Sequence, residues 1–166
     1  MSARREPRKP KNPKSCHERA LGLLAVRPRS RRELERRLLQ ARFEADEVAD
    51  VLRRLERVGL IDDEAFARQY AEHRFGSRKE GSRAVVNGLR AAGIAPSLAV
   101  AVAEQAPEDE EERAAALAAA RAPRLRGLPP EKAFARLSSL LMRRGFGPEI
   151  ARSATRKALA IEAEDG

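Results

Sequence analysis

The residues with reactive side chains are few, and their spacing does not suit catalysis. The two histidines, His17 and His73, lie in different predicted helices without partners at the spacing of a metal-binding motif. His17 follows Cys16 directly. Neighbouring residues of a helix point about 100° apart, so these two side chains do not face each other. Neither histidine is predicted to act in catalysis.

A run of three acidic residues is another candidate for a cation site. Asp62, Asp63 and Glu64 follow one another and suggest a Mg²⁺ site. Consecutive acidic residues at a helix start more often cap the helix and face its positive end. The chain also has no glycine-rich phosphate loop of the P-loop or Rossmann kind. We therefore predict no catalytic residue, no metal and no cofactor, and hence a protein that is not an enzyme.

Two aromatic residues one helical turn apart suggest a different chemistry. Phe66 and Tyr70 lie on one face of a predicted alanine-rich helix. Aromatic rings can stack on the bases of single-stranded DNA. In a chain with only 4% aromatic residues and no Trp, we favour the alternative that they are the main filling of a thin core.

Arginine dominates the charge of the chain. The net charge is +9, with 28 Arg and 6 Lys, and the pI is near 10.7. A GC-rich genome also raises the arginine content, but a basic protein of this kind commonly binds a polyanion, most often nucleic acid. Five arginines are predicted to lie opposite the apolar faces of two successive helices: Arg32, Arg36, Arg53, Arg54 and Arg57. They are candidates for contacts with DNA phosphates or acidic partner residues, the alternative being a solvated face with intrahelical ion pairs.

The elements that carry these residues are all predicted to be helices. Apolar residues recur at helical spacing, and no stretch alternates apolar and polar residues over the length of a strand. One helix buries Val48, Val51, Leu52 and Leu55 and ends at Gly59, which tolerates the left-handed conformation. Leu60 is expected to pack back onto that helix, and Asp62 or Asp63 to cap the helix that follows. At the start of the preceding helix, Ser30 and Glu33 are expected to form a capping box before Leu34.

A pattern that recurs about every 50 residues predicts tandem units. Phe43, Ile94 and Phe146 each follow the end of a helix and precede another amphipathic helix. Glycine precedes the second and third of these residues, whereas Arg42 precedes the first, which we interpret as one extra residue in that joint. The sequence thus predicts three three-helix units in an elongated, curved stack.

The predicted units cover residues 15–61, 62–106 and 107–161. Residues 1–14 are predicted to be a disordered basic arm and residues 162–166 a disordered tail. The segment 104–112 holds six acidic residues and no basic one. We interpret it as a solvated linker and helix start, the alternative being an acidic mimic of DNA.

The two junctions together resemble a known family. The first junction reads R-P-R-S-x-x-E-L and the second, two helices later, reads G-L-I-D-D-x-x-F-A-x-x-Y. This order of motifs resembles the RecX family, bacterial regulators of the RecA recombinase. The resemblance is strongest over residues 20–74. The residues that carry it are Ser30, Glu33, Leu34, Gly59, Leu60, Asp62, Asp63, Phe66 and Tyr70.

The resemblance implies a protein of DNA repair and the SOS response. It implies binding to the filament of RecA on single-stranded DNA, in the helical groove, with hindered extension and reduced ATPase, recombinase and co-protease activities. Non-specific binding to double-stranded DNA is also compatible with it. A general helical DNA-binding protein, a helix-turn-helix transcription regulator and a protein-only scaffold stay as alternatives.

The expected location is the cytoplasm, and the expected state is a monomer. Cys16 is the one cysteine, which fits a reducing compartment. No apolar run is long enough to span a membrane, and the basic N-terminus lacks the apolar region of a secretory signal.

Overall fold

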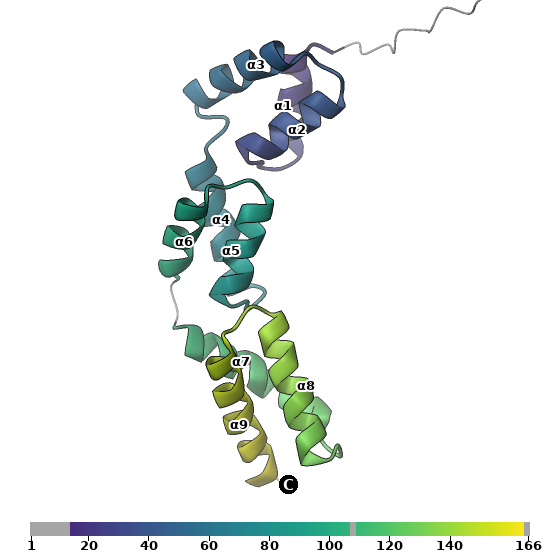
Figure 1. Cartoon of the computed structure of the whole chain (residues 1–166), viewed down its shortest axis with the longest axis vertical. Helices are drawn as coiled ribbons and strands as arrows, with labels where there is room; N and C mark the ends of the chain where they lie inside the picture. Colours follow the sequence, from purple (N-terminus) through teal and green to yellow (C-terminus); the bar gives the residue numbers. More distant parts are fainter. Residues whose placement is uncertain (1–13, 107–108, 165–166) are drawn as a thin grey trace, which may run out of the picture. The chain divides into compact units, whose positions relative to one another are not determined.

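Helices make up the fold throughout the part of the chain that is described. The computed structural model describes residues 14–106 and 109–164, which form nine α-helices, one 3₁₀ helix and no strand (Figure 1). The predicted all-α class is confirmed. The predicted basic arm lies outside the described residues except for Lys14. Residues 162–164, predicted to belong to a tail, are helical, and residues 165 and 166 lie outside the described part.

The helices form three groups of three, which we call the first, second and third domains. The first domain is a compact unit that ends at Ile61, and the other two together form a second unit from Asp62. The residue limits 15–61, 62–106 and 107–161 stay our prediction for the three domains. The helices of the first are α1 (Cys16–Val26), α2 (Arg31–Gln40) and α3 (Ala45–Arg57); of the second, α4 (Asp63–Gly76), α5 (Ser82–Ala91) and α6 (Pro96–Glu104); of the third, α7 (Glu110–Arg121), η1 (Ala122–Leu125), α8 (Pro130–Arg143) and α9 (Pro148–Glu164).

Each domain has a small core of its own. In the first domain, leucines of α2 and α3 and the valines of α3 are buried together. In the second, Phe75, Val85 and Leu89 are the largest fully buried side chains, and Ile94 is also buried with them. In the third, alanines of α7 and α9 pack with Leu137, Leu141 and others. Alanine allows these helices to approach closely, so a thin core suffices for each group.

The joint between the last two helices has the same form in all three domains. Arg42, Gly93 and Gly145 adopt positive φ angles of 65°, 87° and 91° after α2, α5 and α8. The next residue then donates its N–H to a carbonyl in the last turn of the helix, from Phe43 to Leu38 in the first domain. The prediction of one extra residue in the first joint is therefore wrong. Arg42 occupies the glycine position and adopts the left-handed conformation itself.

The helix α3 ends in the same way at Gly59, whose φ is 76°. The N–H of Leu60 binds the carbonyl of Leu55 at 2.9 Å, but the Leu60 side chain is 52% exposed. We expected Leu60 to pack back on the helix; Ile61, which is 4% exposed, takes that place in the core. Asp62 then caps α4, since its side chain accepts the N–H of Ala65 at 2.9 Å.

The second and third domains meet backbone to backbone. Gly81 at the start of α5 donates its N–H to the carbonyl of Arg144 at 2.8 Å. Buried Arg113 of α7 places its guanidinium 4.4 Å from the ring centroid of Phe75 and donates from Nε to the Glu80 carbonyl at 3.4 Å. The two domains are therefore joined by specific contacts at the α4–α5 turn.

Replacing Leu52 with alanine is expected to lower the free energy of unfolding by about 2–5 kcal/mol, because it leaves a cavity in the core of the first domain. Leu52 is fully buried, whereas Val58 just after the same helix is 67% exposed. The matched Val58→Ala variant should change stability little. Urea denaturation measures both. Equal effects would show that the buried face of α3 is misassigned.

Candidate partner-binding surfaces

The helix α2 presents two arginines away from the core. Leu34 and Leu38 are fully buried, while Arg32 and Arg36 are exposed on the other side of the helix. This arrangement follows from the 3.6-residue period of the helix. Both guanidinium groups are accessible to a phosphate or carboxylate of a partner.

The helix α3 carries the other three predicted arginines, Arg53, Arg54 and Arg57, which are also exposed. Arg53 forms an ion pair with Asp50 of the same helix, so its charge is partly neutralised. Arg31 Nε lies 2.9 Å from Glu56 Oε1, which ties the start of α2 to the end of α3. The two arginine-bearing faces therefore belong to helices that are held side by side.

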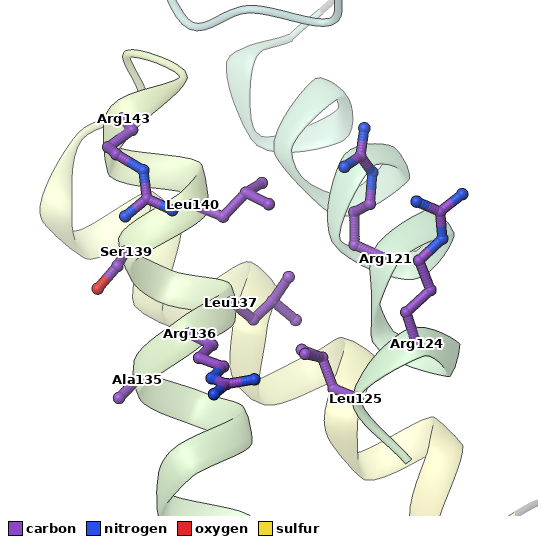
Figure 2. A pocket seen from close by; sticks show the side chains of 9 residues that line it. All are labelled: Arg121, Arg124, Leu125, Ala135, Arg136, Leu137, Ser139, Leu140 and Arg143. Carbon is purple, nitrogen blue, oxygen red and sulfur yellow. The ribbon is translucent and has the colours of Figure 1, made fainter. Parts of the chain in front are cut away.

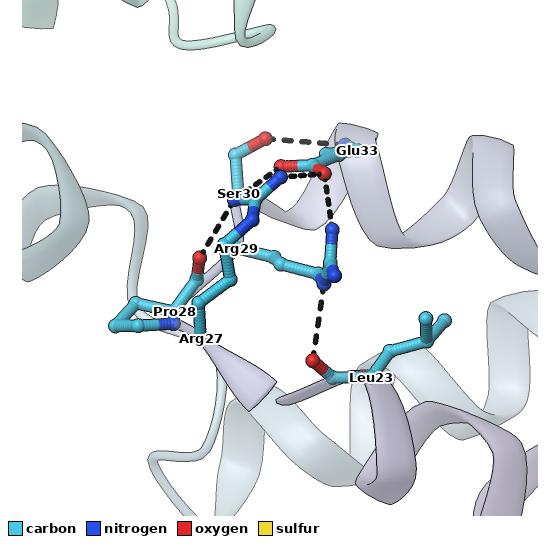
Figure 3. Close-up of polar contacts among 6 residues, drawn as sticks. All are labelled: Leu23, Arg27, Pro28, Arg29, Ser30 and Glu33. Atoms are coloured by element: carbon cyan, nitrogen blue, oxygen red, sulfur yellow. Dashed lines mark hydrogen bonds and ion pairs between the residues drawn. The ribbon is translucent and has the colours of Figure 1, made fainter. Parts of the chain in front are cut away.

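The R-P-R-S-x-x-E-L motif at the start of α2 stabilises the loop between α1 and α2 (Figure 3). The Glu33 carboxylate lies 2.5 Å from a guanidinium nitrogen of both Arg27 and Arg29, and Arg29 Nε donates to the Leu23 carbonyl at 3.1 Å. Ser30 Oγ accepts the Glu33 N–H at 3.1 Å. Arg29 and Glu33 are both buried. These bonds fix the loop between α1 and α2 and thereby the direction of α2.

Replacing Glu33 with Gln is expected to lower the free energy of unfolding at neutral pH by about 2 kcal/mol, because a neutral amide weakens the charge-assisted hydrogen bonds that Arg27 and Arg29 donate at a buried site. Burial alone raises the pKa of Glu33, but the hydrogen bonds and charges of Arg27 and Arg29 outweigh it and hold the pKa below its usual value. Because the pKa of Glu33 is lower in the folded than in the unfolded state, its carboxylate contributes its full stabilisation at pH values above the unfolded-state pKa. That contribution is lost as the pH falls through the folded-state pKa. The difference from wild type should therefore shrink in acid.

Urea denaturation at a series of pH values measures this difference. Glu35→Gln is the matched control, since Glu35 is more exposed and lies 3.8 Å from its partner Arg31. A deficit for Glu33→Gln that stays constant into acid would contradict the assignment of the carboxylate as the stabilising group.

Phe66 and Tyr70 line the edge of the core of the second domain. Their ring centroids lie 6.2 Å apart, and both rings are half-buried against the core. Arg74 donates to the Tyr70 hydroxyl at 2.7 Å and lies 4.9 Å from its ring centroid. Our expectation that they are the main filling of the core needs correction, because that position belongs to buried Phe75. The two rings pack on the core rather than form its centre.

A second basic surface lies in the third domain and was not predicted. A groove of about 610 Å³ runs between α8 on one side and α7 and η1 on the other (Figure 2). Four arginines line it: Arg121, Arg124, Arg136 and Arg143. The sequence signal was the spacing of Arg136, Leu140 and Arg143, which places them along one face of a helix. Between α7 and α8, residues 122–125 form the 3₁₀ helix η1, which carries one side of the groove.

The described residues show no arrangement suited to metal binding. None of them form a cluster of three or more His, Cys, Asp or Glu side chains able to hold an ion. Burial and, to a lesser extent, Glu47 raise the pKa of the Cys16 thiol, which keeps it protonated in the core of the first domain. Within the same described part, every helix is too short or too polar to cross a membrane.

Comparison with family models accounts for most of the chain. Residues 16–55 match the first three-helix domain of RecX, residues 62–102 the second and residues 108–155 the third. The chain belongs to the RecX family. The resemblance drawn from the two junctions, strongest over residues 20–74, is thereby confirmed, and the RecX matches include all three domains.

Relatives named regulatory protein RecX are similar over most of their length. The protein from Streptomyces coelicolor is 38% identical over 146 residues, which cover 87% of this chain and 78% of that protein. The protein from Mycolicibacterium smegmatis is 38% identical over 162 residues, with 92% and 86% covered. That RecX family members are named as regulators supports the prediction that this chain is not an enzyme.

Solved RecX structures share the fold. The crystal structure of RecX from Lactobacillus salivarius superposes with a TM-score of 0.75 at 20% identity, covering 86% of this chain and 94% of that one. A crystal structure of regulatory protein RecX gives a TM-score of 0.72 at 25% identity, covering 81% and 67%. The three-helix fold of these domains is therefore the one seen in solved RecX structures.

Proposed function

We propose that this protein regulates the RecA recombinase by binding the RecA filament on single-stranded DNA. Binding hinders extension of the filament and so lowers its ATPase, recombinase and co-protease activities. The observation that carries the proposal is the match of all three domains to RecX. The proposed site of action is the cytoplasm, and the proposed state before binding is a monomer.

The exposed arginines of α2 and α3 are the proposed contacts in the first domain. A filament on DNA offers phosphates and acidic side chains, and several arginines on adjacent helices can bind such groups and release counterions. Regulation by this route needs no chemistry, because a protein that binds only one form of the filament shifts the population by mass action. This agrees with a chain built from helices around small cores.

A general DNA-binding protein or a helix-turn-helix transcription regulator is the second candidate. The basic charge and the short helices favour it as well. A regulator of transcription would protect one duplex sequence in a footprint, whereas the proposed RecA regulator binds single-stranded DNA with little sequence preference and strong salt dependence.

The decisive experiment is a titration of the protein into RecA hydrolysing ATP on single-stranded DNA. Hydrolysis is expected to fall at substoichiometric protein if filament ends are blocked, because one blocked end affects many subunits. Binding along the groove would require nearer one protein for every few RecA subunits. Unchanged ATPase, strand exchange and filament length at saturating protein would overturn the proposal.

A further inference from the structure

The groove of the third domain combines an apolar floor with a charged border. Figure 2 shows Leu125 of η1 and Leu137 and Leu140 of α8 pointing into the space between the two sides. Leu137 is almost fully buried, while the other two leucines are only partly covered. The floor therefore offers aliphatic surface to a side chain of a partner.

The charged border consists of arginines from both sides. Arg121 and Arg124 come from α7 and η1, and Arg136 and Arg143 come from α8. Among the described residues, no ion pair links any of the four to an acidic side chain. Four like charges around one hollow repel each other, and three of the four side chains are exposed. The core does not need them there, so their charge is available to a ligand.

We propose that this groove binds an acidic peptide segment of a partner protein, with an apolar side chain as its anchor. The carboxylates of the peptide pair with the arginines at the border, where each planar guanidinium group can donate two parallel hydrogen bonds to one carboxylate. The anchor covers the leucines of the floor. The inference goes beyond the regulator proposal, because it assigns a ligand to the third domain whatever the first domain binds.

The lining of the groove favours a peptide over nucleic acid. Surfaces for single-stranded nucleic acid combine basic side chains with aromatic rings on which the bases stack. The residues that line this groove include no aromatic ring, and the floor is aliphatic. Phosphates alone would leave that floor exposed. A leucine or phenylalanine flanked by Asp and Glu would instead cover the floor, while the acidic side chains pair with the arginines at the border.

The test is fluorescence anisotropy of the full chain with a short labelled peptide of Asp and Glu around a central pair of Leu. A second peptide replaces the acids with Asn and Gln, a third replaces the leucines with Ser, and labelled oligo(dT) is the nucleic-acid probe. The groove variant is Arg124→Glu with Arg136→Glu. The matched control is Arg152→Glu with Lys157→Glu, because both residues are exposed on α9 and neither lines the groove.

The acidic peptide is expected to bind wild type and control alike, and the groove variant at least about tenfold more weakly. Both altered peptides should also bind wild type more weakly. Equal binding to groove variant and control, no binding to wild type, or equal binding of the amide peptide would overturn the proposal. A loss confined to oligo(dT) would show a nucleic-acid surface and overturn it too. RecA is absent, so failure here leaves the regulator proposal untouched.

Discussion

Replacing Gly145 with alanine is expected to lower the free energy of unfolding of the unit that begins at Asp62 by about 3 kcal/mol or more, from left-handed strain and overpacking together. Gly145 has a φ of 91°, and a Cβ built there lies 2.4 Å from both Cβ and N of Ala84. Those atoms belong to the first turn of α5, so relief requires the second and third domains to move apart.

Two further glycines separate strain from crowding. Gly127, in the same domain, has a φ of 85° with nothing within 4 Å of a built Cβ, so Gly127→Ala reports strain alone. Gly81 has a negative φ of −80°, but its built Cβ lies 2.4 Å from the Gly145 carbonyl carbon, so Gly81→Ala reports crowding alone. Chemical denaturation compares the three variants. If Gly145→Ala costs no more than Gly127→Ala, the close approach of the domains contributes nothing.

The helices and their ends were predictable because their signals are local. Apolar spacing in α3 identifies its buried face, and Gly59 and Asp62 mark the end of one helix and the start of another within four residues. The repeated joint was visible from Phe43, Ile94 and Phe146. The extra residue predicted in the first joint was wrong because an arginine gives no sequence signal for the left-handed conformation, which Gly93 adopts without strain and Arg42 also adopts.

Contacts that depend on packing were not predictable in the same way. The sequence pairs Glu33 with Ser30 as a capping box, yet only the folded loop brings Arg27 and Arg29 to the same carboxylate. The groove of the third domain exists because η1 and α8 lie opposite each other. The packing of these two helices, and not the sequence of either one, brings their arginines to the same groove. Exposed arginines on the first domain were found because helical geometry alone places them outside.

Changing Arg32 and Arg36 together to Glu is expected to raise the protein concentration needed for half-inhibition of RecA ATPase at least about tenfold, because attraction to an anionic surface becomes repulsion. Both side chains are exposed and neither forms an ion pair among the described residues, so helicity and stability should stay close to wild type. The parallel variant on α3 is Arg53→Glu with Arg57→Glu.

DNA affinity of the same variants decides which partner the arginines bind. Loss of inhibition with unchanged affinity for single-stranded DNA assigns the contact to RecA, and parallel loss of both assigns it to phosphates. Arg83→Glu with Arg90→Glu on α5 is the matched control, since both residues are exposed and the change in net charge is the same. If that control loses inhibition equally, net charge governs binding and the faces of α2 and α3 have no special part in it.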